Sequence, residues 1–354
     1  MLLLSDFDYD LPEDLIAQFP ADKRENSRML VLNRNEHSIS HKHFYDIVDL
    51  IEPDSLLVLN NTKVLPARLY GTKETGAKIE IFLLKPVEDS TEHESVWQVL
   101  IKPSKRVKSG TIVKVSAELS VEVLKRLEDD GEWLVKLVYA GGNLLEVLHR
   151  NGNIPLPPYI ERKMQTEDIK KLDFERYQTV YAKDEGSVAA PTAGLHFTKE
   201  ILDKLKAKGV GIAYVTLNVG LGTFRPVKCE NVLEHKMHSE TFEITQEAAD
   251  LINRAKSEGK KIIAVGTTTV RTLETAYQKY GEIKACHDHS ELFIYPPYEF
   301  KVIDNLITNF HLPKSTLLML VSALAGKDFI FEAYKEAIAQ RYRFFSYGDC
   351  MYIC

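Results

Sequence analysis

The stretch TQEAADLINRAKSEGKKIIAVGTTTVRTLETAY, residues 245–277, decides the fold class. The first part of this stretch follows the capping residue Thr245 and ends at Gly259. Its apolar residues recur at i, i+3, i+4 and i+7, so they lie on one face of a helix. The apolar run KIIAV, residues 261–265, predicts a buried strand, and a second helical pattern follows GTTT. Helix, strand and helix in this order predict an α/β domain with a largely parallel sheet.

The same pattern continues on the N-terminal side of this stretch. Thr198 is placed to cap a helix that ends near Gly209, and the strand pattern IAYVTLNV follows at residues 212–219. Farther upstream, EDLIAQF at 13–19 has a helical pattern and RMLVLN at 28–33 has a strand pattern. We therefore assign residues 1–62 and 153–354 to one α/β catalytic domain.

Residues 63–152 have a different pattern, in which short alternating strands are separated by Gly, Ser, Pro and charged turns. The strand patterns are AKIEIFLLK, SVWQVLIKP, GTIVKVSAELSVEVL and GEWLVKLVY. Several short strands at this spacing predict a small closed barrel or sandwich. After NIPLPPYI, a proline-rich linker, the α/β pattern resumes, so the sequence predicts an all-β barrel domain inserted into the α/β domain.

Length, charge and cysteine content narrow the class of protein. The chain has 354 residues and a net charge of −6, which argues against general attraction to nucleic acid. The longest apolar run, STLLMLVSALAG, is shorter than the roughly 18 residues of a membrane span, and the four cysteines show no paired spacing. We expect a cytoplasmic protein with reduced thiols. The basic run KPSKRVKSG, residues 102–110, is either a solvated hairpin or a local nucleic-acid patch.

Three loops between the predicted α/β elements are candidates for ligand binding. They are SVAAPTAGLHFT at 187–198, NVGLGTF at 218–224 and AVGTTTVR at 264–271. Ligands of open α/β sheets bind beyond the carboxyl ends of the strands, and helix N-termini attract anions. None of the three contains a complete G-x-G-x-x-G or Walker motif, so each one alone is equally compatible with a structural turn.

Histidines and carboxylates form a second set of candidates. His235 and His238 lie beside Glu234 and Glu240 in LEHKMHSE, which supplies acid and base groups near neutral pH. The spacings match no zinc signature, so we expect no metal. For His196 and His311, each next to apolar residues, a hydrogen-bonded core histidine is an equally good interpretation; we list only His196 among the catalytic candidates.

Taken together, the motifs resemble one family from end to end and in order. The segments that carry the resemblance are FDYDLPEDLIAQFPADKRENSRMLVL, LVLNNTKVLPARL, YQTVYAKDEGSVAAPTAGLHFT, VTLNVGLGTFRPV, EHKMHSE, VGTTTVRTLE, ITNFHLPKSTLLMLVSAL and YRFFSYGDCM. The chain is similar to the S-adenosylmethionine:tRNA ribosyltransferase-isomerases of queuosine biosynthesis. The resemblance also implies an α/β domain with an inserted β-barrel, and no metal.

The resemblance implies a transferase that moves the ribosyl part of S-adenosylmethionine onto the 7-aminomethyl group of a 7-deazaguanine base (preQ1) at the tRNA wobble position. The ribose is isomerised to an epoxycyclopentane, which gives epoxyqueuosine-tRNA, and adenine and methionine leave. S-adenosylmethionine is then a co-substrate and tRNA the partner, with no membrane involved and a monomer expected. A wobble base must leave the anticodon loop to react, so basic residues are expected around the active site.

The chemistry assigns roles to residues in these motifs. A sulfonium acidifies the adjacent C5′ protons, so a base is needed there, while departing adenine needs a proton and transient oxygen charge needs donors. The candidate catalytic residues are His196, His238, Glu240, Thr267 and Thr268. The candidate residues for binding S-adenosylmethionine are Pro191, Thr192, Gly194, Phe197, Gly220, Gly222, Thr223, Phe224 and Arg271. The candidate RNA-binding residues are Lys102, Lys105, Arg106, Lys108, Arg225, Arg341 and Arg343.

Within these sets, Phe197 or Phe224 is expected to face the sulfonium by cation–π attraction. Arg225 and Arg271 are expected to hold the methionine carboxylate or an RNA phosphate.

Two positions depart from the family pattern. Asn218 stands where the family usually has histidine, and an amide cannot act as a general base. Asn61 stands where the family often has aspartate. Two rival functions also follow from the residues: a nucleotide-using α/β enzyme that acts on a small metabolite, and a non-catalytic RNA-binding protein that uses the barrel and its basic hairpin.

Overall fold

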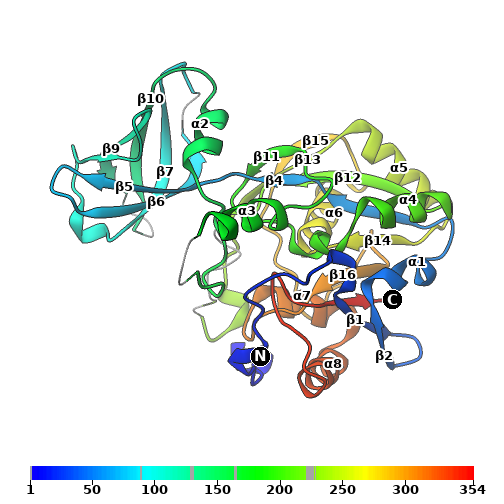
Figure 1. Ribbon diagram of the computed structural model, residues 1–354. Helices are drawn as coiled ribbons and strands as arrows, with labels where there is room; N and C mark the ends of the chain where they lie inside the picture. The colour runs from blue at the N-terminus through cyan, green and yellow to red at the C-terminus, as the bar shows by residue number, and fades with distance from the viewer. Residues whose placement is uncertain (1, 88–89, 128–130, 163–165, 221–226, 228) are drawn as a thin grey trace.

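The computed structural model of the chain describes residues 2–354 except 88–89, 128–130, 163–165, 221–226 and 228. Figure 1 shows a large α/β body, which contains both chain termini, with a smaller β-barrel beside it. The prediction of an α/β domain with an inserted barrel is confirmed. The exact domain boundaries at residues 62/63 and 152/153 stay a prediction.

The body is built on a large central sheet. Within the described residues its strands, in spatial order, are β15 (Cys286–Ser290), β13 (Glu240–Ile244), β12 (Gly211–Leu217), β3 (Leu56–Asn60), β14 (Ile262–Val265), β16 (Asn305–Asn309), β17 (Cys350–Ile353), β1 (Arg28–Asn33) and β2 (Ser38–His43). A separate parallel pair joins β11 (Asp184–Ser187) to β4 (Thr62–Val64).

The centre of the sheet is parallel, as predicted, but its flanks are mixed. Strands β12, β3, β14 and β16 run parallel to one another. The flanking strands include antiparallel pairs, which are β12 with β13, β13 with β15, β16 with β17, and β1 with β2. A helical crossover makes neighbouring strands parallel. In contrast, β13 follows β12 through a connection in which the described residues form only the short 3-10 helix η8 (Val232–Glu234).

Helices cover both faces of the sheet. The α-helices are α1 (Ile47–Leu50), α3 (Glu167–Arg176), α4 (Lys199–Ala207), α5 (Gln246–Ser257), α6 (Thr267–Tyr280), α7 (Thr316–Ala325) and α8 (Lys327–Ala339). The remaining short 3-10 helices of the body are η1 (Leu4–Phe7), η2 (Glu13–Leu15), η3 (Arg24–Asn26), η4 (Phe44–Asp46) and η6 (Thr192–His196). The helical pattern at 13–19 yields only η2, because Ile16 leaves the helix and bridges Phe344 in an extended conformation.

The predicted caps and the alternation of the central strands explain the packing. The Thr198 side chain accepts a hydrogen bond from the Ile201 N–H, and the Thr245 side chain accepts one from the Ala248 N–H. Alternate residues of β3 point to opposite faces: Leu56 and Val58 join the core under α5 to α8, whereas Leu57 and Leu59 join the core under α1 and α4. A strand buried on both faces therefore has the continuous apolar sequence LLVLN.

The barrel is closed and antiparallel. Its strands, in spatial order, are β10 (Trp133–Tyr139), β7 (Glu94–Lys102), β6 (Lys78–Pro86), β5 (Arg68–Lys73), β8 (Ile112–Lys114) and β9 (Leu119–Arg126), with η5 (Ser104–Arg106) after β7 and α2 (Leu144–Asn151) after β10. Strands β5 and β8 close the barrel at Gly71, where an added Cβ would lie 2.7 Å from the Lys114 carbonyl oxygen. A side chain at this position would push the two strands apart.

Candidate active site

The loops at the carboxyl ends of the central strands meet around a small cavity. Its volume is about 90 Å³, and residues from six separate segments line it. The lining includes Ala189–Ala193, Val219, Gly266–Thr268 and Thr308–Leu312. Four of the predicted site residues, Pro191, Thr192, Thr267 and Thr268, therefore come together at the sheet edge where ligands of α/β proteins bind.

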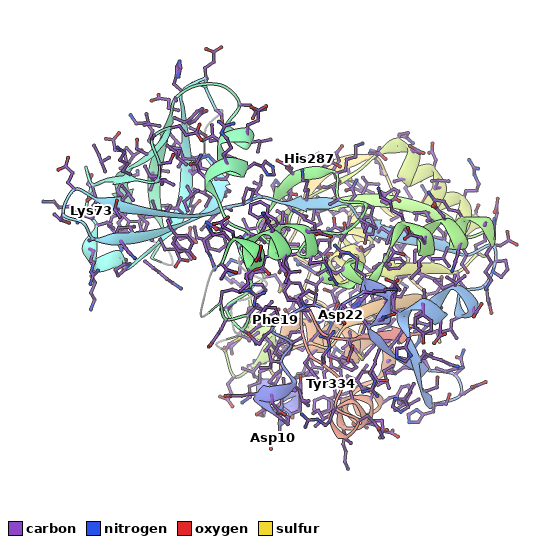
Figure 2. The ribbon with its side chains drawn as sticks, in the orientation of Figure 1. Asp10, Phe19, Asp22, Lys73, His287 and Tyr334 are labelled. Carbon is purple, nitrogen blue, oxygen red and sulfur yellow. The ribbon has the colours of Figure 1, made fainter. Side chains whose placement is uncertain are left out.

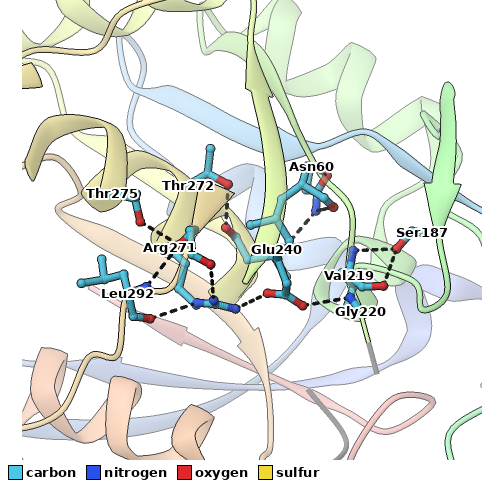
Figure 3. Close-up of polar contacts among 12 residues, drawn as sticks. Asn60, Ser187, Val219, Gly220, Glu240, Arg271, Thr272, Thr275 and Leu292 are labelled. Atoms are coloured by element: carbon cyan, nitrogen blue, oxygen red, sulfur yellow. Dashed lines mark hydrogen bonds and ion pairs between the residues drawn. The ribbon is translucent and has the colours of Figure 1, made fainter. Parts of the chain in front are cut away.

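Two of the predicted binding loops are joined by hydrogen bonds through Ser187. The buried Ser187 hydroxyl accepts a hydrogen bond of 2.9 Å from the Val219 N–H (Figure 3). It also donates one of 2.6 Å to the Ala189 carbonyl. The Val188 N–H also donates to the Val219 carbonyl at 3.1 Å. The SVAAPTAGLHFT and NVG segments are thus held in one fixed arrangement.

Gly194 is required for packing. A Cβ at this position would lie 2.1 Å from the Tyr181 hydroxyl and 2.8 Å from a Thr179 methyl group. Gly194 is buried and does not line either the small cavity or the larger cleft described below. The glycine therefore allows Tyr181 to pack against the loop.

His196 is a buried histidine in this structure. Its side chain is 3% exposed, and its Nε2 accepts a hydrogen bond of 3.3 Å from the Asn309 side-chain amide. Burial, together with the positive charge of Arg343, lowers the pKa of His196 to about 3. Phe197 is also fully buried, with its ring 4.8 Å from that of Phe44 in an edge-to-face contact. Neither His196 nor Phe197 lines the small cavity or the larger cleft described below, where other candidate residues meet.

Glu240 and Arg271 form a buried ion pair beside the second loop. The Arg271 guanidinium donates to one Glu240 carboxylate oxygen, and the other oxygen accepts a hydrogen bond of 2.9 Å from the Gly220 N–H (Figure 3). The remaining Arg271 nitrogens donate to the carbonyls of Leu292 at 3.2 Å and Ser290 at 3.4 Å. Arg271 is therefore committed to contacts within the protein, and Glu240 fixes the start of the loop after Val219.

A larger cleft lies between the barrel and the body. Its volume is about 1380 Å³, and body residues Asn218–Gly220 and His238–Thr241 form one wall. The opposite wall comes from the barrel and includes Trp97, Gln98 and Glu132. Two of the three proposed bases, His238 and Glu240, thus face this cleft together with Gly220. The third proposed base, His196, does not.

The lining of the cleft is acidic. Among its described residues, one lysine, Lys85, accompanies four carboxylates: Glu92, Glu132, Glu185 and Glu240. Glu185 and Glu240 are paired with Lys63 and Arg271, so the described lining keeps a modest excess of negative charge, which favours positively charged groups in this space.

Glu185 also connects the barrel to the body. One of its oxygens contacts Lys63 Nζ at 2.5 Å and Nε2 of His149, on α2 of the barrel, at 2.9 Å. Burial raises the Glu185 pKa, but the hydrogen bonds from these two partners outweigh it, so the pKa lies below its usual value.

The two positions that depart from the family pattern both make hydrogen bonds that suit an amide. The Asn218 oxygen accepts a 2.8 Å hydrogen bond from the Thr62 hydroxyl at the cleft wall. Asn61 accepts from the Thr216 hydroxyl at 2.6 Å and donates to an Asp184 oxygen at 3.1 Å. Because a carboxylate at position 61 would meet the Asp184 carboxylate, asparagine is compatible with this network and aspartate is not.

The sequence motifs did not identify the lining residues that come from segments far from the motifs along the chain. The barrel wall of the cleft, with Trp97, Gln98 and Glu132, has no local motif that marks it. His311, which lines the small cavity, contacts the Thr308 hydroxyl through Nε2 at 2.9 Å, and burial lowers its pKa to about 3. His311 was considered from the sequence but is not among the catalytic candidates; it lies two residues after the buried strand β16.

The described members of the proposed RNA-binding set do not line either cavity. Lys102, Lys105, Arg106 and Lys108 are exposed around η5. The Arg106 carbonyl accepts a hydrogen bond from Lys73, whose position at the barrel end remote from the body is labelled in Figure 2.

The two C-terminal arginines contact other segments of the body. Arg341 pairs with Asp14 at 2.6 Å, and Arg343 donates to the Phe19 carbonyl at 3.1 Å. These two clusters line neither cavity, and their role in RNA binding stays a prediction. Gly222, Thr223, Phe224 and Arg225 lie outside the described residues.

Neither a metal cluster nor a membrane helix is found in the described part of the chain. No three His, Cys, Asp or Glu side chains gather there in a way that could hold a metal ion. No helix among the same residues is both long and apolar enough to cross a membrane. That the reaction requires no metal stays a prediction.

Comparisons with known proteins agree with the motif pattern. The family model described as "Queuosine biosynthesis protein" matches residues 4–353. Proteins named S-adenosylmethionine:tRNA ribosyltransferase-isomerase from Clostridioides difficile and Staphylococcus haemolyticus are 54% and 51% identical, over 98% and 99% of both chains. A crystal structure of S-adenosylmethionine tRNA ribosyltransferase from Thermotoga maritima is 38% identical with a TM-score of 0.54, covering 99% of this chain and 100% of that one. The resemblance inferred from the motifs is confirmed, and this chain belongs to the queuosine biosynthesis protein family.

Proposed function

We propose that this chain is an S-adenosylmethionine:tRNA ribosyltransferase-isomerase. It transfers and isomerises the ribosyl group of S-adenosylmethionine onto the aminomethyl group of preQ1 at the tRNA wobble position. The products are epoxyqueuosine-tRNA, adenine and methionine. The observation that carries the proposal is the 1380 Å³ acidic cleft between barrel and body, in which His238, Glu240 and Gly220 of the family motifs meet.

The charge of the cleft suits both substrates. S-adenosylmethionine carries a sulfonium and an ammonium group, and the aminomethyl group of the target base is a protonated amine before it reacts. Carboxylates such as Glu92 and Glu132 stabilise these cations, and Trp97 offers an apolar surface at the same wall. Among the described lining residues, Lys85 is the one lysine or arginine that could pair with a phosphate, so we expect the base to enter the cleft and most of the RNA backbone to stay outside.

The positions of the candidate bases divide their roles. His238 is exposed in the cleft and can take a proton from C5′ of S-adenosylmethionine. Glu240 is held by Arg271 and by the Gly220 N–H, so it orients the loop and presents negative charge to the sulfonium. We assign Arg271 a positioning role through Glu240. Thr267 and Thr268, at the N-terminus of α6, are donors for oxygen charge near the small cavity.

The remaining parts of the proposal concern the protein's setting. We place the reaction in the cytoplasm, where its tRNA substrate is found, and expect a monomer that needs no metal. His196, Phe197 and Gly194 are the buried part of the SVAAPTAGLHFT loop and anchor it to the body in this conformation. A substrate role for His196 or Phe197 would require the SVAAPTAGLHFT segment to move.

The test measures adenine and methionine release from S-adenosylmethionine with three acceptors: tRNA carrying preQ1, the same tRNA with guanine at the wobble position, and the free base. Release of both products with the modified tRNA alone supports the proposal. Equal activity on the free base would favour an enzyme of small metabolites. Binding of tRNA without release of either product would favour a non-catalytic RNA-binding protein.

A further inference from the structure

A second hollow lies on the outer face of the barrel, away from the cleft. Its volume is about 830 Å³, and four barrel segments line it. Its lining residues are Tyr70, Gly71, Thr72, Lys78, Ile79, Glu80, Lys102, Pro103, Lys114 and Val115. The hollow thus combines apolar residues and an exposed tyrosine with three lysines from β6, β7 and β8.

Strand register places these lysines in two adjacent rows. In one row, Thr72 of β5 is directly opposite both Lys78 of β6 and Lys114 of β8. In the next row, Glu80 lies between Tyr70 and Lys102. Directly opposite residues of antiparallel strands have Cβ atoms about 5 Å apart on the same face. Three ammonium groups therefore share one continuous surface.

The lysine charges are not neutralised within the protein. Lys78, Lys102 and Lys114 are exposed, and none has an ion-pair partner among the described residues. The nearby carboxylate of Glu80 pairs with Arg68 at 3.3 Å. The basic turn around η5, with Lys105 and Arg106, continues from Lys102 along the chain. A concentrated positive surface in a chain of net charge −6 favours a polyanion.

The distance between the hollow and the cleft limits the size of the ligand. Lys78 and Lys85 lie on the same strand, β6, and border the hollow and the cleft respectively. At a rise of about 3.3 Å per residue, seven residues separate these two lysines by roughly 23 Å, and the nearest lining residues on this strand, Glu80 of the hollow and Leu84 of the cleft, are roughly 13 Å apart. A folded RNA spans this range, so its phosphates can lie at the hollow while its base lies in the cleft.

We propose that this hollow binds phosphates of the tRNA outside the wobble nucleotide and positions the anticodon loop at the acidic cleft. The inference rests on the proposed function, because it takes tRNA as the substrate. It follows from the separation of charge: the cleft favours cations, so the RNA backbone must be held elsewhere. Phosphate contacts of this kind position the RNA, while contacts to the base within the cleft specify it.

The experiment compares two triple variants of equal charge. The test variant is Lys78→Gln/Lys102→Gln/Lys114→Gln. The control variant is Lys199→Gln/Lys204→Gln/Lys206→Gln, which changes three exposed lysines around α4, a helix that Figure 1 shows on the side of the body away from the barrel. Binding of preQ1-tRNA is measured by fluorescence anisotropy between about 50 and 200 mM salt, the range over which counterion release is large.

The expected result is a selective loss of RNA binding in the test variant. Its Kd for tRNA rises by at least about tenfold at low salt, and the slope of log K against log salt falls by about 2 to 3. The KM for tRNA rises, while kcat at saturating tRNA and the affinity for S-adenosylmethionine stay within twofold of the wild type. The control variant behaves as the wild type in all five measurements.

Two outcomes separate this inference from the proposed function. If the wild type releases adenine with preQ1-tRNA but the test variant keeps its affinity and salt slope, the hollow is not an RNA site and the function stands. An equal loss in both triple variants would also overturn the inference, because the effect would then come from net charge alone. If the wild type releases no adenine, the proposed function fails, and the salt slopes still test RNA binding at the hollow.

Discussion

The Arg271 guanidinium and the Glu240 carboxylate are paired in the interior of the body, with both side chains almost completely buried. The second carboxylate oxygen receives the Gly220 N–H, so one ion pair orients the loop that follows β12. An ion pair of this kind is costly to break on one side, since the remaining charge stays in a medium that solvates it poorly.

Glu240→Gln removes the negative charge but keeps the size of the side chain. We expect the free energy of unfolding to fall by about 3 kcal/mol, because Arg271 remains buried without a counter-ion. Adenine release should also fall, since the loop at Gly220 loses its charged anchor. Urea denaturation followed by circular dichroism measures the first effect. The matched control is Glu243→Gln, an exposed position on the same strand, which should change stability by less than about 0.5 kcal/mol.

His238→Gln tests the proposed base. We expect kcat for adenine release to fall by about 100-fold or more, which is typical of losing a general base, with no change in the unfolding transition. His235→Gln is the control, because His235 lies three residues away, contacts Phe293 edge-on and does not line the cleft. A His238→Gln enzyme that keeps half of the wild-type rate would rule out this residue as the base.

His196 should affect the pH dependence of stability. Its pKa of about 3 in the folded state lies below the ordinary value of 6.5, so below pH 6.5 the unfolded chain binds a proton that the folded chain excludes. The contribution of His196 to the free energy of unfolding is fully present above pH 6.5 and is lost progressively as the pH decreases toward 3. Between pH 7.5 and 5.5 the loss is about 1.4 kcal/mol, and His196→Gln should remove it from the total.

Circular dichroism is the suitable readout for the His196 experiment, because both tryptophans, Trp97 and Trp133, lie in the barrel and do not report on the body. His311, whose pKa is also about 3, keeps its own contribution in the His196→Gln variant. An unchanged difference in stability between the two pH values would show that His196 is protonated in the folded protein.

Gly194→Ala should destabilise the SVAAPTAGLHFT loop. The new methyl group would lie 2.1 Å from the Tyr181 hydroxyl, and overpacking of this kind typically costs about 1–3 kcal/mol. Tyr181→Phe removes that hydroxyl, which is buried without a hydrogen-bond partner among the described residues, so it should be neutral or slightly stabilising alone. The double variant should recover part of the loss in thermal denaturation. No recovery would mean that the strain lies in the backbone.

Much of the fold follows from local sequence. The caps at Thr198 and Thr245 and the alternating strands of the barrel were predicted from spacing, because caps and periodicity depend on neighbours along the chain. The mixed flanks of the sheet were not predicted, since the direction in which β13 and β17 enter depends on pairing partners far away in sequence.

The sequence predicted part of the candidate site, but it did not show which of the predicted residues are buried. His238 and Glu240 were chosen as acid–base groups and do line the cleft. The sequence also predicts His196 as an acid–base group. In the structure His196 is buried, and burial keeps its imidazole neutral. The sequence also predicts the basic turn from Lys102, but not that it lies outside the cleft, because Lys102 ends β7 four residues beyond the cleft residue Gln98.

The sequence by itself determined which helices and strands form, that a barrel interrupts an α/β domain, and to which family the chain belongs, because these depend on local pattern and motif order. Only the tertiary structure decided which side chains meet. Glu240 pairs with Arg271, 31 residues later, and Ser187 bonds to Val219, 32 residues later, because β12 and β14 both flank β3 in the sheet. Contacts of this kind are set by strand order and burial, which no spacing along the chain specifies.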